Sequence, residues 1–489
     1  MNHEWLIIFL VSVDIQDTNN DNINNEAKKV LKDKFNTEII EKLKGIVADD
    51  DIKLILINNV KLISKEIKYN TECFELTGED LTKFKIELPE AFQLQDKESL
   101  LTLLQYLKDN FKSNRVMIST YGHGSMFGIF TTRNFKNDKG FNNYMLLEQK
   151  DLDYWNVISP NLMEKSSLNI DGEKIDYLIA ARPYSSNKYS YKSIKAFYQE
   201  IIVVESNSSG ERQKFKVLTN EEFAWAIKES FGKIDFLIFN NCVMQNIYAQ
   251  HSFRGVVNYL IAPATGIVYP CFNIRGIINF LKAGITLKNP QISNYIVESF
   301  RKDNVDYEQH KDVIEEFIVV SIQLDKLKEI FEILEQLKDY LKTELTGQNK
   351  NIFACAIANS LEETYPMEYN TFTGETIFDL LQILDSAYLK KYEKLQIFQQ
   401  RLLEIISTSG DEFIHTFIGK TAYDAGYKKY YRSKPDIIVS GICIYFPKSS
   451  TQNAYIKPFF NSINYESDLE KGLKWYDDVI ETYLAIMNN

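Results

Sequence analysis

Cysteine is scarce in this chain of 489 residues, and its few copies form no recognisable pattern. They are an odd number, they are widely spaced, and no two of them form a CxxC pair. This argues against a disulfide scaffold and against a structural zinc site, so we expect reduced thiols. The five cysteines are Cys73, Cys242, Cys271, Cys355 and Cys443.

Long hydrophobic runs are also missing. The longest apolar run near the N-terminus, residues 5–13, is far shorter than a membrane span. It has no basic residues before it and no small-residue cleavage site after it, as a signal peptide would have. We therefore expect no membrane partner and a cytoplasmic protein, or a secreted one if an export signal has been removed from the chain.

Clusters of Lys and Arg are not found either, and the formal net charge is -11. Nucleic-acid binding needs clustered cations that contact phosphates, so we expect no nucleic-acid partner. A hydrophobic share of 45% and a charged share of 25% are ordinary for a soluble globular protein. The expected partners are proteins or peptides, and the length indicates two or three domains.

Two loops lack the residues that would make them ion-binding or phosphate-binding sites. The segment DIQDTNNDNINNE (residues 14–26) has no Gly where an EF-hand requires its sharp turn. The segment GHGSMFG (residues 122–128) has neither the spacing of a phosphate-binding loop nor a following Lys. From these residues we expect no cofactor and no metal.

The first half of the chain does contain a regular alternation of strand and helix patterns. Short apolar, β-branched stretches predict strands at residues 5–13, 53–60, 116–121, 235–240 and 259–262. Helical spacing predicts helices at 27–43 and 100–111, and Thr219 with Glu222 forms a capping box for a helix through Ser230. This order predicts an α/β fold with a mostly parallel central sheet and helices on both faces.

The rhythm is broken twice along the chain. Residues from about 131 to 215 are rich in Asn, Lys, Ser and Tyr and form a long insertion. Beyond about residue 286 the pattern changes to long amphipathic helices, with strands expected at 317–322 and 437–446. We predict a first domain, 1–285, that contains the insertion, and a mostly helical C-terminal domain, 286–489, with two strands.

The strongest chemical signal is a histidine and a cysteine that each follow a buried strand. His123 follows RVMISTYG, and Cys242 follows IDFLIFNN. If these strands are parallel neighbours, the imidazole and the thiol emerge side by side at the carboxyl edge of the sheet, where open α/β folds build their sites. That arrangement is typical of a cysteine nucleophile, and a nearby imidazole and the start of the helix expected after Cys242 would lower the thiol pKa.

Each residue alone also has an ordinary interpretation. An isolated Cys at a strand end is usually a small buried residue, and a His between glycines is usually structural. His251 should lie at the surface, about two helical turns from Cys242. Cys271 either borders the site or is an inert buried thiol. The pairing of His123 with Cys242, together with the motifs around them, favours the catalytic interpretation.

An ordered set of segments resembles the clostripain family of cysteine peptidases, within the caspase-like group (clan CD). The set spans nearly the whole chain apart from the insertion. It consists of LIIFLVSVDIQDTNN, YGHGS, LTNEEFAWAIKESFGKIDFLIFNNCVM, NYLIAPATGIVYPCFN, SGICIYFP and an aromatic helix containing Trp475. The resemblance implies a caspase-like three-layer α/β/α sandwich and a bacterial cysteine endopeptidase.

The same resemblance implies the roles of individual residues. Cys242 would attack the scissile carbonyl, and His123 would protonate the leaving amine. The backbone N–H groups of Gly124 and Cys242 would hold the oxyanion. Self-cleavage would fall in the 131–215 insertion, and calcium would follow from the resemblance only, since no motif supports it. The implied substrate pocket consists of Asn240, Asn241, Ala262, Pro263, Ala264 and Thr265.

One position departs from the family pattern. Clostripain relatives usually have Asp two residues before the cysteine, where it pairs with an Arg or Lys of the substrate, but this chain has Asn240. An amide cannot neutralise a guanidinium, so we predict a neutral or small polar preference. The alternatives are a weak or inactive relative that serves as a binding or regulatory module, and a thiol hydrolase acting on non-peptide amides. An activating protein partner is also expected for an intracellular protease.

Overall fold

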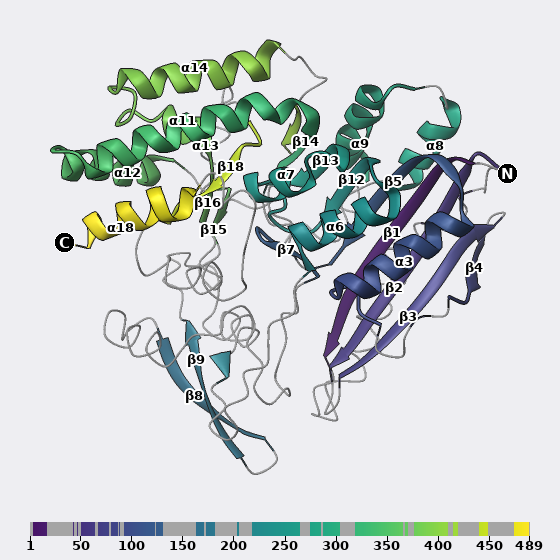
Figure 1. The fold of residues 1–489 in the computed structure, drawn as a ribbon. Helices are drawn as coiled ribbons and strands as arrows, with labels where there is room; N and C mark the ends of the chain where they lie inside the picture. Colours follow the sequence, from purple (N-terminus) through teal and green to yellow (C-terminus); the bar gives the residue numbers. More distant parts are fainter. Residues whose placement is uncertain are drawn as a thin grey trace.

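The computed structural model contains a central sheet flanked by helices, with further helices stacked beyond one end of it (Figure 1). The structure describes residues 3–16, 43, 46, 50–63, 67–77, 80–86, 88, 92–122, 124–130, 163–170, 173–180, 203–204, 218–264, 274–284, 287–303, 318–364, 367–369, 376–408, 414–418, 440–447 and 474–488. Of the helix predicted at 27–43, only Leu43 is among them.

The central sheet of the described chain has nine strands in the order β17-β14-β13-β12-β5-β1-β2-β3-β4. Its middle is parallel, because β1 pairs with β2 and β5, and β12 pairs with β5 and β13, in that sense. These five are the strands predicted from the sequence. Their bounds are His3–Gln16 for β1, Ile52–Ile63 for β2, Ser113–Tyr121 for β5, Ile234–Asn240 for β12 and Val257–Pro263 for β13.

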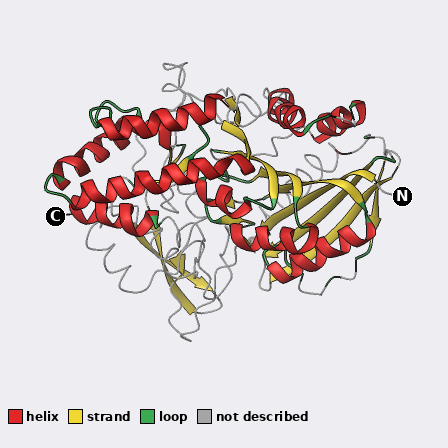
Figure 2. Cartoon of the chain, turned by 45° about the horizontal axis from the view of Figure 1, so that its top comes forward, coloured by secondary structure: helices red, strands yellow, loops and turns green. Residues whose placement is uncertain are grey.

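Helices cover both faces of this sheet (Figure 2), and the alternation of side chains along β1 explains why. Leu6, Ile8 and Leu10 point into one apolar cluster, and Trp5, Ile7, Phe9 and Val11 point into the other. The first cluster is closed by α3 (Lys97–Asn110), α6 (Asn220–Phe231) and α7 (Ile247–Phe253). The second is closed by α8 (Ile274–Ala283) and α9 (Asn289–Asp303). The predicted three-layer α/β/α fold is confirmed.

The capping box predicted for α6 is also confirmed. The Thr219 hydroxyl oxygen accepts from the Glu222 backbone N–H at 3.2 Å, and the Glu222 carboxylate accepts from the Thr219 N–H at 3.0 Å. The helix ends at Gly232, whose φ of 73° is left-handed. Both ends of α6 are therefore encoded locally, which fixes the point where β12 begins.

Antiparallel strands border the parallel middle on both sides. At one edge lie β3 (Ile67–Thr77) and β4 (Asp80–Phe84), which the sequence did not predict. The reason is their charge: Glu75 of β3 pairs across the sheet with Lys53, and Glu72 pairs with Lys83 of β4 at 2.6 Å. Cross-strand ion pairs let a charged segment form a strand without the apolar pattern that a sequence search relies on.

At the other edge lie β14 (Ile318–Gln323) and β17 (Ile414–Ile418). The strand predicted at 317–322 is thus β14, and it pairs with β13 in the central sheet. The sheet therefore crosses the predicted boundary at residue 285, and one apolar cluster continues from β1 to the C-terminal helices. The division into two separate domains stays a prediction.

The C-terminal part stacks helices beside the end of the sheet (Figure 1). The long ones are α11 (Leu327–Thr346), α12 (Lys350–Glu363) and α14 (Glu393–Thr408), followed at the C-terminus by α18 (Thr482–Met487). A small antiparallel sheet of β15 (Glu368–Tyr369), β16 (Thr376–Asp379) and β18 (Cys443–Tyr445) lies among them, and the short α13 (Leu380–Leu384) follows β16. Among the described helices, none has the length and the apolar composition needed to cross a membrane.

The two segments that flank the insertion pair with each other. The short strands β6 (Gly124–Ser125), β7 (Gly128–Ile129) and β11 (Leu218–Thr219) form an antiparallel sheet in which Ile129 lies opposite Leu218. The side chain of Asn220 adds a hydrogen bond to the Met126 carbonyl at 3.0 Å. Within the insertion, β8 (Met163–Ile170), β9 (Glu173–Ala180) and β10 (Val203–Val204) form a separate sheet, drawn at the bottom of Figure 1.

Candidate functional site

Cys242 lies just beyond the end of β12, at the carboxyl edge of the parallel strands. The neighbouring strand is β5, and Asn240 lies opposite Tyr121. The two strands that carry the candidate pair are thus parallel neighbours, as the sequence predicts. His123 itself falls outside the described residues, so its distance from Cys242 stays a prediction, but Gly122 and Gly124 on either side of it are described.

Gly124 places the backbone next to His123 directly against Cys242. A β-carbon at residue 124 would lie 2.7 Å from the Cys242 carbonyl oxygen and 3.0 Å from the Cys242 nitrogen. It would also lie 2.8 Å from the β-carbon of Asn241. A real β-carbon does not approach other atoms so closely, so only glycine fits here. The two backbone segments expected to hold an oxyanion therefore lie in contact.

Asn241 joins the Cys242 loop to the end of β5. Its side-chain oxygen accepts a hydrogen bond from the Thr120 hydroxyl, and its side-chain nitrogen donates to the Gly122 carbonyl at 3.0 Å. The side chain is fully buried, where an unmade hydrogen bond is costly. The sequence suggests Asn241 as a pocket residue, but the structure places its amide against the segment that leads to His123.

The other predicted pocket residues gather at the same edge and are buried. The Asn240 side-chain nitrogen donates to the Ser119 hydroxyl at 3.2 Å, and Asn240 is 1% exposed. Ala262 and Pro263 end β13, Ala264 follows it, and all three are buried as well. Thr265 and Cys271 belong to 265–273, which lies outside the described residues. Their role in a substrate pocket stays a prediction.

Val243, the residue after Cys242, has a strained backbone. Its φ is 63°, in the left-handed region, and its side chain is 2% exposed. A β-branched residue rarely adopts this conformation, which costs on the order of 1–3 kcal/mol. The strain turns the chain sharply after Cys242, and such strained positions cluster at functional sites.

The helix expected directly after Cys242 begins later than the sequence suggests. α7 starts at Ile247, and the Asn246 side-chain oxygen caps it by accepting from the Ala249 N–H at 3.0 Å. The helix start is therefore separated from Cys242 by residues 243–246, which weakens any effect of the helix on the thiol. His251 of α7, which we expect at the surface, is half-buried, and its ring packs edge-on against Phe331 at 5.1 Å.

The described cysteines differ in their environments. Cys73 and Cys443 are buried, and burial raises the pKa of Cys73 to about 12 and that of Cys443 well above its ordinary value. Because the thiolate is the nucleophile, both are poor candidates. Cys355 is exposed on α12, and Cys242 is half-buried at the sheet edge. Within the described part of the chain, Cys242 is thus the accessible cysteine that lies at a strand end.

Among the described residues, no three His, Cys, Asp or Glu side chains are grouped as they would be around a metal ion. Gly124 packs against the Cys242 backbone, and the neighbouring Asn241 is hydrogen-bonded to Thr120 and Gly122. They can hold backbone geometry and donate hydrogen bonds, which suits covalent catalysis by a thiol.

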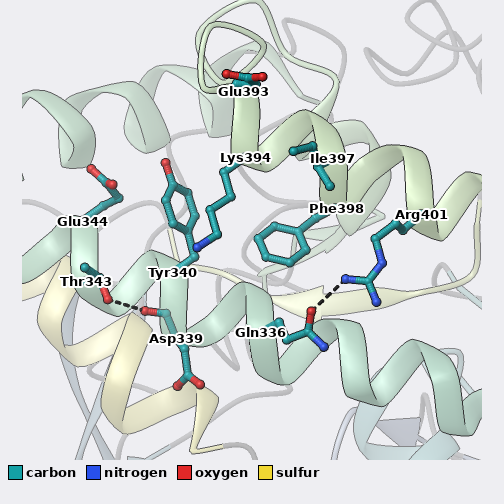
Figure 3. Close-up of a pocket in the computed structure, with 10 residues that line it drawn as sticks. All are labelled: Gln336, Asp339, Tyr340, Thr343, Glu344, Glu393, Lys394, Ile397, Phe398 and Arg401. Carbon is teal, nitrogen blue, oxygen red and sulfur yellow. Dashed lines mark hydrogen bonds between the residues drawn. The ribbon is translucent and has the colours of Figure 1, made fainter.

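An open groove of about 860 Å³ lies between α11 and α14, and its lining residues come from those two helices (Figure 3). Arg401 donates to the Gln336 side chain at 2.7 Å, and the Lys394 ammonium lies 5.0 Å from the centre of the Tyr340 ring. Burial, and then Glu344, raise the pKa of Tyr340 to about 12. None of the lining residues belongs to the Cys242 loop.

The sequence anticipates the strand ends and misses the supports around them. The sequence pattern does not identify three buried polar residues, Gln245, Gln250 and Asp379. The two glutamines follow Cys242 and donate to Gly441, and Asp379 accepts from Ser440. Two glutamines inside the apolar stretch VMQNIYAQ were the available signal. Their partners lie too far away in the chain to be read from it.

Comparison with protein-family models finds no match, and comparison with curated proteins finds none either. The fold does match solved structures. An inactive zymogen C11 protease from Parabacteroides distasonis is 14% identical, with a TM-score of 0.50, over 98% of this chain and 99% of the other. A secreted C11 cysteine protease from Bacteroides thetaiotaomicron is 11% identical, with a TM-score of 0.51, over the same shares of both chains. The described part of this chain therefore has the caspase-like fold of the C11, clostripain-family cysteine proteases.

Proposed function

We propose that this protein is a cysteine endopeptidase in which Cys242 is the nucleophile and His123 is its partner. One observation carries the proposal: the loop that contains His123 packs through Gly124 against the backbone of Cys242. The two residues follow neighbouring parallel strands, which is the arrangement that delivers two side chains to one edge. The shared fold with C11 proteases is consistent with this function.

The chemistry needs only groups that these residues supply. The Cys242 thiol gives its proton to His123 as the sulfur attacks the scissile carbonyl carbon, and the resulting oxyanion is held by the backbone N–H groups of Gly124 and Cys242. His123 then gives this proton to the leaving amine as the C–N bond breaks, which leaves a thioester on Cys242. Water attacks the thioester and loses a proton to His123, the C–S bond breaks, the acid product leaves, and the proton returns to the sulfur. An oxyanion donor of this kind contributes roughly 3 kcal/mol.

Asn240 is the residue that we expect to set the preference at the cleavage site. Its amide is neutral and is engaged with Ser119. A substrate guanidinium placed beside it would lose its hydration without gaining a countercharge. For a buried ion this costs on the order of several kcal/mol. The proposed substrates are therefore protein segments with a neutral or small polar residue before the cut.

Self-cleavage within the insertion is part of the proposal. The insertion begins and ends at β7 and β11, which pair with each other. A cut between them would leave both products joined through that pairing and through the Asn220 hydrogen bond to Met126. Cleavage could therefore change access to the site without dissociating the fold.

A library of peptide electrophiles that differ in the residue before the reactive group tests the proposal. We expect one member to label the protein stoichiometrically at Cys242, and we expect labelling and peptide cleavage to vanish in Cys242→Ala. Cys355→Ala removes an exposed thiol on α12 and should leave both unchanged. Intact mass of the wild type and of Cys242→Ala reports self-cleavage in the same preparation.

The same experiment can contradict the proposed peptidase activity. If Cys242 reacts no faster than Cys355 with every peptide electrophile, and no peptide is cut, the protein is a binding or regulatory module on a protease fold. Cleavage of small amides but not of peptides would instead indicate a thiol hydrolase.

A further inference from the structure

Two buried glutamines tie the loop after Cys242 to one distant carbonyl. The side-chain nitrogens of Gln245 and Gln250 both donate to the Gly441 carbonyl oxygen, at 3.3 Å and 2.6 Å. Both glutamines are fully buried. Gly441 lies 196 and 191 residues further along the chain. One peptide group of the C-terminal part therefore holds both the loop and the helix that follow the candidate nucleophile.

The position of Gly441 is fixed by its own backbone. Its φ is 71°, a left-handed conformation that glycine adopts without strain. A β-carbon there would lie 2.7 Å from a methyl carbon of Val320, on β14. The residue thus fits only as glycine, between the central sheet and the Cys242 loop.

Asp379 holds the same segment through the backbone N–H groups of Ser440 and Gly441. Its buried carboxylate accepts hydrogen bonds from the backbone N–H groups of Ser440 at 2.7 Å and of Gly441 at 3.1 Å. It accepts a third from the Ser440 hydroxyl at 2.9 Å and a fourth from the Leu381 N–H at 3.1 Å. A carboxylate is costly to bury without donors, and here four of them offset part of that cost.

The glutamines are not explained by packing alone. Within the described residues, the side-chain oxygens of Gln245 and Gln250 have no hydrogen-bond partner. An apolar residue of similar size would avoid that cost, so the gain must come from the two donors that reach Gly441. Polar groups in such a place make the geometry of a loop specific.

We propose that the backbone of Gly441 is a clamp that positions the Cys242 loop, with Gln245 and Gln250 holding its carbonyl oxygen and Asp379 holding its N–H. These three are positioning residues, since none is adjacent to the reacting atoms. The clamp maintains the sharp turn at Val243, so the small sheet of β16 and β18 takes part in shaping the site. The consequence for turnover rests on the proposed peptidase function, whereas the coupling itself does not.

Gln250→Leu breaks the shorter of the two bonds and also removes a side-chain oxygen that has no partner among the described residues, so the fold should be retained. Hydrogen exchange is followed for the amides of residues 241–250, and peptide turnover is measured in parallel. We expect exchange in 241–250 to become at least tenfold faster, while β1 and α3 stay unchanged. We expect kcat to fall at least tenfold with KM unchanged, because the misplaced Cys242 loop slows the reaction of bound substrate without weakening its binding.

Ser386→Ala is the matched control, because it removes another buried hydrogen bond, from Ser386 to the Ser360 hydroxyl at 2.6 Å. It should change neither exchange in 241–250 nor kcat. Gln245→Leu, which breaks the longer bond, should give the same pattern with a smaller amplitude and serves if Gln250→Leu does not fold. If the amides of residues 241–250 exchange at the same rate in the glutamine variants and in Ser386→Ala, the clamp is overturned. Faster exchange of these amides in a glutamine variant whose kcat is normal also overturns it. If the wild type cuts no peptide, the proposed function fails, and the exchange result still decides whether the coupling exists.

Discussion

Gly124 and Cys242 are in backbone contact across the carboxyl edge of the sheet. A β-carbon on residue 124 would stand 2.7 Å from the carbonyl oxygen of Cys242, although Gly124 does not have a left-handed φ. The requirement for glycine at this position is therefore steric. It comes from the approach of two loops that are far apart in the sequence.

Gly124→Ala should separate these loops. The added methyl group forces the Cys242 backbone away, and overpacking of this kind costs typically about 1–3 kcal/mol. We expect the rate at which a peptide electrophile labels Cys242 to fall by roughly tenfold or more, since 1.4 kcal/mol corresponds to a factor of 10. Gly347→Ala is the control, because Gly347 has an ordinary φ of -78° and lies at the exposed end of α11. Equal labelling rates in the two variants would show that the contact has no role in reactivity.

Asn240→Asp should introduce a preference for basic residues. The Ser119 hydroxyl can donate to the new carboxylate, and a substrate Arg can supply the countercharge that the wild type lacks. We expect kcat/KM for an Arg peptide, relative to an Ala peptide, to rise about tenfold. Asn241→Asp places the same charge one residue away, where the side chain is held by Thr120 and Gly122, and should give no such gain. A wild type that already prefers Arg would contradict our view of Asn240.

Val243 should respond to substitution in an unusual order. Ala at this position keeps the strained left-handed φ, whereas Gly relieves it, and both lose the same buried contacts to a similar extent. We expect Val243→Gly to unfold at a higher urea concentration than Val243→Ala. The free energies of unfolding of the two variants should differ by about 1 kcal/mol. At Val257, buried in β13, the order should be the usual one, with Gly less stable than Ala. The same order at both positions would mean that Val243 is not strained in solution.

The parallel strands could be predicted because their residues are β-branched and apolar on both faces, as in β12. From the sequence, the neighbour relation of β5 and β12 could be stated only as a condition, and the observed pairing of the two strands fulfils it. The β3–β4 pair was not, because its charges are neutralised across the sheet by Lys53 and Lys83. The β8–β9 hairpin carried a usable signal in Asp171 and Gly172, a pair typical of tight hairpin turns.

The supports of the site were not predictable for a different reason. The hydrogen bonds of Gln245 and Gln250 to Gly441 span about 190 residues, and no local pattern encodes such a contact. The start of α7 was misjudged because the strained Val243 delays the helix until Asn246 can cap it. Local propensity thus located the two strand ends, whereas the geometry between them depends on contacts made only in the folded chain.

Asp379 should make the stability of the protein depend on pH. Burial, which outweighs the four hydrogen bonds, raises the pKa of this carboxyl from 3.8 to about 6. The folded state therefore holds the proton more tightly than the unfolded state. The resulting stability is fully present below pH 4, falls as the pH rises from about 4 to 6, and is lost above that range. A shift of this size corresponds to roughly 3 kcal/mol.

Asp379→Asn removes this titration and should isolate its contribution. The Asn nitrogen would face backbone N–H donors, so the variant is less stable than the wild type throughout. However, the difference in the free energy of unfolding, measured by urea titration, should be largest near pH 4 and should shrink by about 2–3 kcal/mol towards pH 7. Asp477→Asn, which removes an exposed aspartate in the C-terminal helix, is the control for the loss of one carboxyl group. A difference that grows with pH would mean that the four donors hold Asp379 ionised, and that the carboxyl binds its proton less tightly in the folded protein than in the unfolded chain.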